Sequence, residues 1–225
     1  MYFMFVSNFE NFHCYYTTSV AHLGLKQYTI GMDYTKYDAV FMIGPQGSGK
    51  GTQGRELAKR IGFFYWEMGG ILREEAKKET PFGQKIKGLI DAGHLLEDDE
   101  LFRILNTELP EVIKHKRILF DGVPRRVGQG AFLIHYLSQN GFNQFATILI
   151  DVPKQESIKR LLERAHHEFR TDDTPEKIEY RLDLYETETK PVLKFLQGIG
   201  DYYAIDGVGT VEEIEQRIDA ALGVE

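Results

Sequence analysis

The chain has 225 residues, of which 42% are hydrophobic, and a formal net charge of −7 at pH 7. This length is sufficient for one sizeable hydrophobic core and does not require a second independent domain. No basic stripe accompanies the negative charge, which argues against a nucleic-acid surface, and no apolar run approaches the roughly 20 residues of a membrane span. We therefore expect a protein that does not bind nucleic acid or membranes. The single cysteine, Cys14, excludes an internal disulfide, which indicates a reducing compartment, so we expect the protein to be cytoplasmic.

The first 36 residues differ from the rest of the chain, because they are rich in aromatic side chains and follow no helical or strand period. No Lys or Arg precedes Lys26, which argues against a secretory or transit signal. Met32 lies directly before the first predicted strand, so two interpretations stay open: a start site assigned too early, or a genuine extension that packs or binds something. We predict a main domain over residues 37–225 and assign residues 1–36 no function.

In the main domain, short apolar segments typical of buried strands alternate with longer segments of helical pattern. Strands are predicted at residues 39–43, 63–66, 117–121, 145–152 and 202–205. Helices are predicted up to residue 61 and at residues 70–78, 81–91, 98–113, 129–140, 154–164, 175–197 and 211–222. The helix from residue 175 has Thr174 as its N-cap and Pro175 at its first position. This order predicts an α/β fold with a doubly wound parallel sheet of about five strands, in which ligands bind at the carboxyl ends of the strands.

A glycine-rich segment, GPQGSGKGT at residues 44–52, lies between the first predicted strand and the first predicted helix. Glycines in this setting let the backbone N–H groups turn toward a phosphate, the helix N-terminus adds partial positive charge, and Lys50 supplies a full charge to the outer phosphates. The segment departs from the general pattern GxxxxGK[ST], because Gly51 follows Lys50 and Thr52 comes one residue late. It predicts a nucleoside triphosphate site, with an ordinary glycine-rich turn as the alternative.

Two predicted strands end in an aspartate that could hold the metal ion of a nucleotide site, Asp121 and Asp151. Composition alone does not rank them. The turn after Asp121, residues 122–125, would set the guanidinium of Arg125 beside the phosphates, and this favours Asp121 as the residue that binds Mg²⁺ through water. Asp151 is interpreted as a strand-end cap.

Arginines form the second group of candidate residues: Arg73, Arg125, Arg160, Arg164, Arg170 and Arg181. Arg160 and Arg164 are four residues apart on one predicted helix and therefore share a face. Phosphoryl transfer is catalysed mainly by positioning and by neutralising charge on the transferred group, and one such arginine is worth roughly 10³ to 10⁵ in rate. We expect these side chains to converge on the phosphates, while solvated surface is the alternative for any one of them alone.

Three segments carry a family resemblance: GSGKGTQ at residues 47–53, DGVPR at residues 121–125 followed by Gln129, and DVP at residues 151–153 followed by two arginines. Together they resemble the phosphate loop, the DGFPR segment and the approach to the lid in adenylate kinases of the nucleoside monophosphate kinase family. The resemblance extends from about residue 38 to the C-terminus.

This resemblance implies a phosphate-loop fold with a helical monophosphate-binding insertion at about residues 67–96 and a short lid at about residues 164–173. It implies that ATP is bound by Gly47, Ser48, Gly49, Lys50, Gly51, Thr52, Arg160, Arg164 and Gly209. It implies that AMP is bound by Met68, Arg73, His94, Leu95, Leu96, Gly122, Val123, Pro124, Arg125, Gln129, Arg170 and Arg181. Catalytic roles fall on Lys50, Arg125, Arg164, Arg170 and Arg181. Gln129 would read the adenine of AMP, and Gly209 would meet the ATP base through its carbonyl.

The acceptor side departs from the family pattern. Where the family usually has Ser or Thr, then Gly and Asp, this chain has Met68, Gly69 and Gly70, so a hydroxyl and a carboxylate are missing. One neutral hydrogen bond is worth roughly 0.5 to 1.5 kcal/mol, so Met68 should weaken or reshape the site without abolishing it. The retained Gln129 favours adenine, because a site built to bond a base edge rejects partners that leave it unpaired. Val123 in place of Phe and Arg126 in place of Thr are smaller changes.

The leading hypothesis is reversible phosphoryl transfer from MgATP to AMP, giving two ADP by direct in-line attack, in a monomer of nucleotide biosynthesis. Closure of the lid and of the AMP-binding helices should exclude water. The enzymatic alternative is the same reaction on UMP, CMP or GMP, which Met68 keeps open. A nucleotide-dependent switch or a catalytically lapsed binding protein is the third reading, against which Lys50 and the retained arginines argue.

Overall fold

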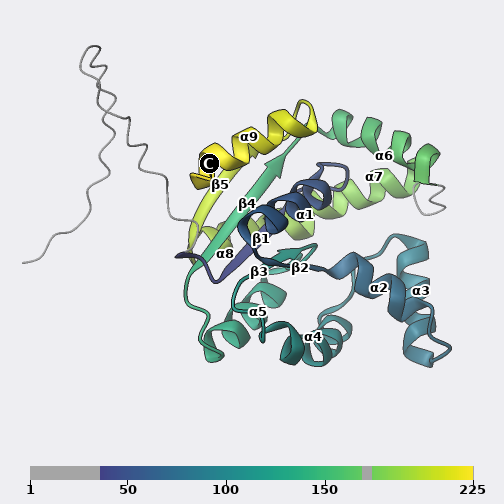
Figure 1. The fold of residues 1–225 in the computed structure, drawn as a ribbon. Helices are drawn as coiled ribbons and strands as arrows, with labels where there is room; N and C mark the ends of the chain where they lie inside the picture. The colour runs from purple at the N-terminus through teal and green to yellow at the C-terminus, as the bar shows by residue number, and fades with distance from the viewer. Residues whose placement is uncertain (1–35, 169–173, 225) are drawn as a thin grey trace, which may run out of the picture. The chain divides into compact units, whose positions relative to one another are not determined.

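The computed structural model describes residues 36–168 and 174–224 of the chain. These residues contain a five-stranded sheet in the order β2-β3-β1-β4-β5, in which every neighbouring pair is parallel (Figure 1). The strands are β1 (Ala39–Ile43), β2 (Phe64–Glu67), β3 (Ile118–Asp121), β4 (Phe145–Asp151) and β5 (Asp201–Asp206). The predicted α/β class and the doubly wound parallel sheet are therefore confirmed.

The described helices follow the predicted order. They are α1 (Lys50–Ile61), α2 (Met68–Ala76), α3 (Pro81–Ala92), α4 (Asp98–Val112), α5 (Val127–Gln139), α6 (Lys154–Glu168), α7 (Pro175–Leu184), α8 (Lys190–Gln197) and α9 (Val211–Leu222). Thr174 is the N-cap of α7, as predicted, and its hydroxyl accepts a hydrogen bond from the Lys177 N–H. A π-helical segment, Tyr185–Thr189, joins α7 to α8, so the predicted helix over residues 175–197 is continuous but not uniform. None of the described helices is long and apolar enough to cross a membrane.

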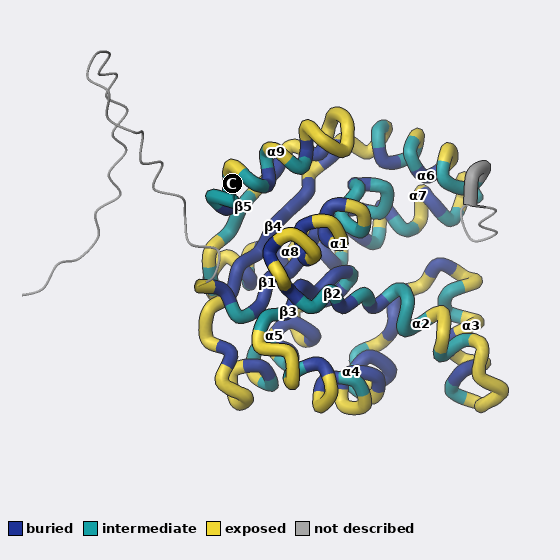
Figure 2. The backbone as a smooth tube through the Cα atoms, in the orientation of Figure 1, coloured by how far each residue is buried: buried dark blue, intermediate teal, exposed yellow. Residues whose placement is uncertain are grey.

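Side chains of the central strand β1 alternate between two hydrophobic cores. Phe41 points to the face covered by α4, α5 and α8, where its ring stacks on Phe120 with centroids 5.5 Å apart. Val40 and Met42 point to the opposite face, where they pack with residues of α1 and α9. Because both faces are covered, the three inner strands β1, β3 and β4 read as apolar runs and are largely buried, as Figure 2 shows in dark blue. The edge strands β2 and β5 are more exposed.

The carboxyl ends of the strands meet at one edge of the sheet, and the connections after β1, β2 and β3 are three of those that depart from it. The chain leaves β1 into the glycine-rich loop before α1, passes from β2 directly into α2, and leaves β3 after Asp121. Helices α2 and α3 lie to one side of this edge, and α6 and α7 lie to the other (Figure 1). The latter pair shares a small core of Leu161, Ile178 and Leu182. This edge is therefore framed by two helical pairs.

Candidate functional site

The glycine-rich loop forms a closely packed turn against α6. Gly47 has a φ of 81°, a conformation that favours glycine, and a Cβ at this position would lie 2.7 Å from the backbone oxygen of Ser157. Gly49, with a φ of 91°, is the N-cap of α1. The loop therefore directs the backbone N–H groups at the start of α1 toward the edge of the sheet, which is an arrangement suited to a phosphate.

Lys50 is the first residue of α1 and is held inside the loop, where its Nζ donates a hydrogen bond to the Pro45 carbonyl at 3.3 Å. Burial lowers the pKa of Lys50 to about 8, the nearby Asp121 carboxylate opposes this shift, and the guanidinium groups of Arg125 and Arg164 add to it. The ammonium group thus lacks sufficient negative charge around it. A bound polyphosphate would supply that charge.

A cavity of about 680 Å³ opens beside the loop. Of the residues predicted for the site, those that line it are Gly47, Gly49, Lys50, Gly51, Thr52, Met68, Arg73, His94, Leu95, Leu96, Asp121, Gly122, Arg125, Gln129, Arg160, Arg164 and Arg181. The structure therefore brings together side chains from both helical pairs, the loop and the end of β3. This size and this mixture of polar and apolar walls suit a small-molecule ligand.

Five predicted residues do not line the described cavity. The side chain of Ser48 is fully buried inside the loop, and Val123 is buried in the core. Pro124 borders a smaller neighbouring pocket, and Gly209 lies on the loop between β5 and α9. Arg170 falls outside the residues that the structure describes, as do residues 169–173 of the predicted lid at 164–173.

The arginines that line the cavity are held by backbone carbonyls as well as by carboxylates. Arg125 donates from Nε to the Gly122 carbonyl at 3.1 Å, and its burial lowers the pKa of its guanidinium. Arg160 donates to the Ser48 carbonyl at 3.4 Å and to the Gly207 carbonyl at 3.0 Å, so it links α6 to the loop and to the end of β5. A carbonyl contact orients a guanidinium without neutralising its charge, which leaves Arg125 suited to bind an anion. Arg160 additionally pairs with the Glu156 carboxylate at 2.7 Å.

Asp121 ends β3 within this cavity and is the candidate for a metal. Its Oδ2 accepts a hydrogen bond from the Tyr65 hydroxyl at 2.7 Å, and its Oδ1 is buried with no hydrogen-bond partner among the described residues. Within the same residues, no three His, Cys, Asp or Glu side chains are grouped to hold a metal ion. A single oriented carboxylate fits Mg²⁺, which usually keeps several waters and takes further oxygens from phosphates.

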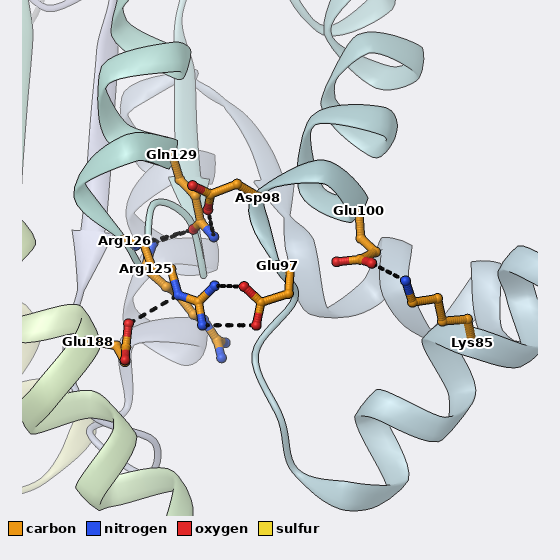
Figure 3. Close-up of polar contacts among 8 residues, drawn as sticks. All are labelled: Lys85, Glu97, Asp98, Glu100, Arg125, Arg126, Gln129 and Glu188. Carbon is orange, nitrogen blue, oxygen red and sulfur yellow. Dashed lines mark hydrogen bonds and ion pairs between the residues drawn. The ribbon is translucent and has the colours of Figure 1, made fainter.

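Gln129 also lines the cavity, and its side-chain amide is held by three hydrogen bonds (Figure 3). Its Oε1 accepts hydrogen bonds from the backbone N–H groups of Arg125 and Arg126 at 3.0 and 3.3 Å. Its Nε2 donates to Asp98 Oδ1 at 3.2 Å. The carbonyl oxygen thus accepts two donors already, and the amide nitrogen keeps one hydrogen for a further acceptor.

Arg126 is held by two carboxylates from other elements. Its guanidinium pairs with Glu97 at 2.5 Å and with Glu188 at 3.1 Å (Figure 3). These two carboxylates raise the pKa of Arg126. Arg126 therefore ties the start of α4 to the π-helical segment and does not line the described cavity.

Sequence reasoning missed four charged or hydroxyl-bearing residues of the site, one of which is Asp91 in the cavity wall. Glu67 and Arg55 line the cavity, and the Tyr65 hydroxyl contacts Asp121. The signal for Glu67 was its place at the end of a strand, since strand ends meet at the ligand-binding edge. Tyr65 and Glu67 are two residues apart on β2 and so share a face.

A strand, a glycine loop with a buried lysine, a helix N-terminus and a cavity lined by arginines define a phosphate-loop nucleotide-binding protein. The family model described as adenylate kinase matches residues 42–200. The chain therefore belongs to the adenylate kinase family.

Similar proteins cover most of the chain. An adenylate kinase of Thermus thermophilus is 37% identical over 186 residues, which is 83% of this chain and 97% of that protein. An adenylate kinase of Parabacteroides distasonis is 38% identical over 183 residues, which is 81% of this chain and 96% of that protein. One of Stenotrophomonas maltophilia is 37% identical over 181 residues, with 80% and 97% covered. The resemblance drawn from three short segments is thereby confirmed over the whole length of these relatives.

Proposed function

We propose that this protein catalyses reversible phosphoryl transfer from MgATP to AMP, giving two ADP. The observation that carries the proposal is the single cavity in which Lys50, Asp121 and Arg125 meet. Lys50 comes from the glycine-rich loop, Asp121 ends β3 and Arg125 lies in the turn after it, so a donor phosphate and an acceptor phosphate would approach each other there. Membership of the adenylate kinase family supports the same reaction.

On the ATP side, the loop at residues 47–52 would bind the phosphates through backbone N–H groups, and Lys50 would contact the transferred group. Arg160 would lie against the ATP base, because its guanidinium already bridges the loop and the Gly207 carbonyl. Arg164 would reach the phosphates from the next turn of α6. The carbonyl of Gly209 would meet the base.

On the AMP side, Arg73 and Arg125 would bind the acceptor phosphate together with Arg181 and Arg170. Met68, His94, Leu95, Leu96 and Gly122 would line the pocket, next to Val123 and Pro124. Gln129 keeps one amide hydrogen, so it favours a base that presents a ring nitrogen as acceptor. Adenine does so at N1, whereas guanine and uracil present an N–H at the corresponding position. This supports AMP over GMP and UMP.

The metal would be held by Asp121 through water, with the phosphates completing its coordination. Bound Mg²⁺ would neutralise charge on the phosphates that it bridges. The protein itself orients the Asp121 carboxylate. The Tyr65 hydroxyl donates a hydrogen bond to Oδ2, and Oδ1, which has no hydrogen-bond partner among the described residues, is left for the hydrated metal. The guanidinium group of Arg125 would stabilise the transferred group in addition to the metal. It is already held in position, so it does not need to reorganise when negative charge develops there.

A second acceptor, another nucleoside monophosphate, is favoured by one observation. Met68 lies at the cavity wall, and its thioether side chain offers no hydroxyl to AMP.

Direct in-line transfer, the monomeric state and the cytoplasmic location stay predictions.

The proposal is tested by measuring ADP formed from ATP and AMP with the purified enzyme and with R125A. We expect two ADP per AMP consumed, and a loss of at least roughly 10²-fold in kcat for R125A with unchanged melting temperature. R103A, which removes an arginine of α4 outside the described cavity, is the matched control and should retain full activity. Little change in R125A would refute the role assigned to Arg125.

A further inference from the structure

Glu67 places a negative charge in the wall of a cavity that is otherwise rich in guanidinium groups. It is the last residue of β2, and its Oε1 accepts a hydrogen bond from Arg73 Nη2 at 2.9 Å. Its Oε2 lies 3.5 Å from Arg55 Nη2, on α1. The carboxylate therefore has two cationic partners from two helices. One of them, Arg73, is a residue that we assign to the acceptor phosphate.

The glycines that follow Glu67 keep space for this contact. A Cβ at Gly69 would lie 3.1 Å from Glu67 Oε1 and 3.2 Å from Arg73 Nη1, so any side chain there would press on both partners. A Cβ at Gly70 would lie 3.9 Å from both Glu67 Oε2 and Arg73 Nη2. A side chain at Gly69 would therefore force the two charged groups to move by a few tenths of an ångström, whereas one at Gly70 would be in ordinary van der Waals contact with them.

We propose that Glu67 is a displaceable anion of the acceptor-phosphate subsite. In the ligand-free enzyme its carboxylate occupies Arg73, and the phosphate of the acceptor nucleotide replaces it there while Arg55 retains the carboxylate. The inference rests on the proposed role of Arg73. A phosphate carries more charge and more acceptor oxygens than a carboxylate, so it competes well for a guanidinium.

Two consequences follow from this exchange. Glu67 lowers the affinity for the acceptor, because binding must first break an ion pair and then place two anions near each other. It also holds Arg73 in position before the acceptor arrives. Arg55 limits the energetic cost, because the displaced carboxylate keeps a cationic partner. Glu67 would thus set the KM for the acceptor without contributing to the transfer step.

The test compares E67Q with E74Q. Glu74 lies on α2, pairs with Lys77 and does not line the described cavity, so its substitution makes the same change in net charge away from the site. For E67Q we expect the KM for AMP to fall about three- to fivefold, with kcat and the KM for ATP unchanged. The dissociation constant of AMP, measured by calorimetry without ATP and Mg²⁺, should fall by the same factor. E74Q should leave all of these values unchanged.

A second pair of variants tests the part of Arg55. R55A should raise the KM for AMP. Without Arg55, the Glu67 carboxylate pairs with Arg73 alone among the described residues, and the phosphate of AMP must then displace it with no second cation to receive it. The R55A effect should vanish in the E67Q background. An unchanged or increased dissociation constant of AMP in E67Q would overturn the proposal. An increase in the Mg²⁺ concentration needed for half-maximal rate would also overturn it, since Glu67 would then serve the metal.

Failure of the proposed function would be recognised separately. If the wild-type enzyme phosphorylates a different monophosphate, the same calorimetric comparison of E67Q and E74Q is made with that nucleotide. A decrease in its dissociation constant would support the role of Glu67, and no decrease would refute it, whichever base is the natural acceptor.

Discussion

We expect Lys50 to make ATP binding depend on pH. Burial lowers the pKa of Lys50 to about 8 from its ordinary value of 10.5. The difference corresponds to about 3 kcal/mol disfavouring the charged form in the ligand-free enzyme. Bound phosphates favour the ammonium form, so the pKa of Lys50 must be higher in the complex. Binding of ATP therefore takes up a proton whenever Lys50 is neutral in the free enzyme.

The sign and size of this uptake follow from the titration of one group. Below about pH 7 Lys50 is already charged, and ATP affinity should not change through this residue. As the pH rises through about 8, the free enzyme loses the proton, so uptake on binding should reach about 0.5 proton at pH 8 and about 0.9 at pH 9. Over the same range the apparent affinity should fall, approaching tenfold per pH unit above pH 9.

Calorimetric titration of ATP in buffers of different ionisation enthalpy measures this uptake directly. K50M is the control variant, because it keeps the length of the side chain and removes the titrating group. We expect K50M to bind ATP weakly at every pH and to take up no proton. No measurable uptake at either pH 8 or pH 9 in the wild-type enzyme, or equal uptake in K50M, would refute this account of Lys50.

Three further substitutions give separate tests. Y65F removes the hydroxyl that orients Asp121 and should raise the Mg²⁺ concentration for half-maximal rate about tenfold; an unchanged metal requirement would show that this hydrogen bond is dispensable. M68T should lower the KM for AMP two- to tenfold, as roughly 0.5 to 1.5 kcal/mol predicts, and a higher KM would mean that the hydroxyl does not reach AMP. G47A places a Cβ 2.7 Å from the Ser157 carbonyl, so thermal denaturation should show a lower melting temperature and little stabilisation by ATP; wild-type behaviour would contradict the packing of the loop.

The parts of the site that were predicted from the sequence are those formed by local order along the chain. A strand, a glycine loop and a helix follow one another within about 25 residues, so residue spacing alone placed Lys50 at the junction of the loop and α1. Asp121, at the end of β3, could be predicted in the same way, because the carboxyl ends of parallel strands share one edge of the sheet. The family resemblance added the assignment of each arginine.

The parts that were missed depend on contacts between distant residues. Tyr65 bonds Asp121 across 56 positions, and no local pattern reveals such a pair. Helix α2 starts at Met68 and not at residue 70, because β2 runs directly into it and its N-cap, Glu67, makes no side-chain capping bond that would mark the start. The π-helical segment, Tyr185–Thr189, was missed because it interrupts the hydrogen bonding of a helix without breaking its continuity.

The preference among acceptors tests the central claim most directly. Initial rates with ATP and each of AMP, CMP, UMP and GMP give kcat/KM for the four monophosphates under one set of conditions. Since Gln129 keeps a single donor for the base, we predict that AMP has the highest kcat/KM and that UMP and GMP lie at least about tenfold below it. A tenfold preference for UMP or GMP over AMP would contradict the assignment of AMP as the acceptor.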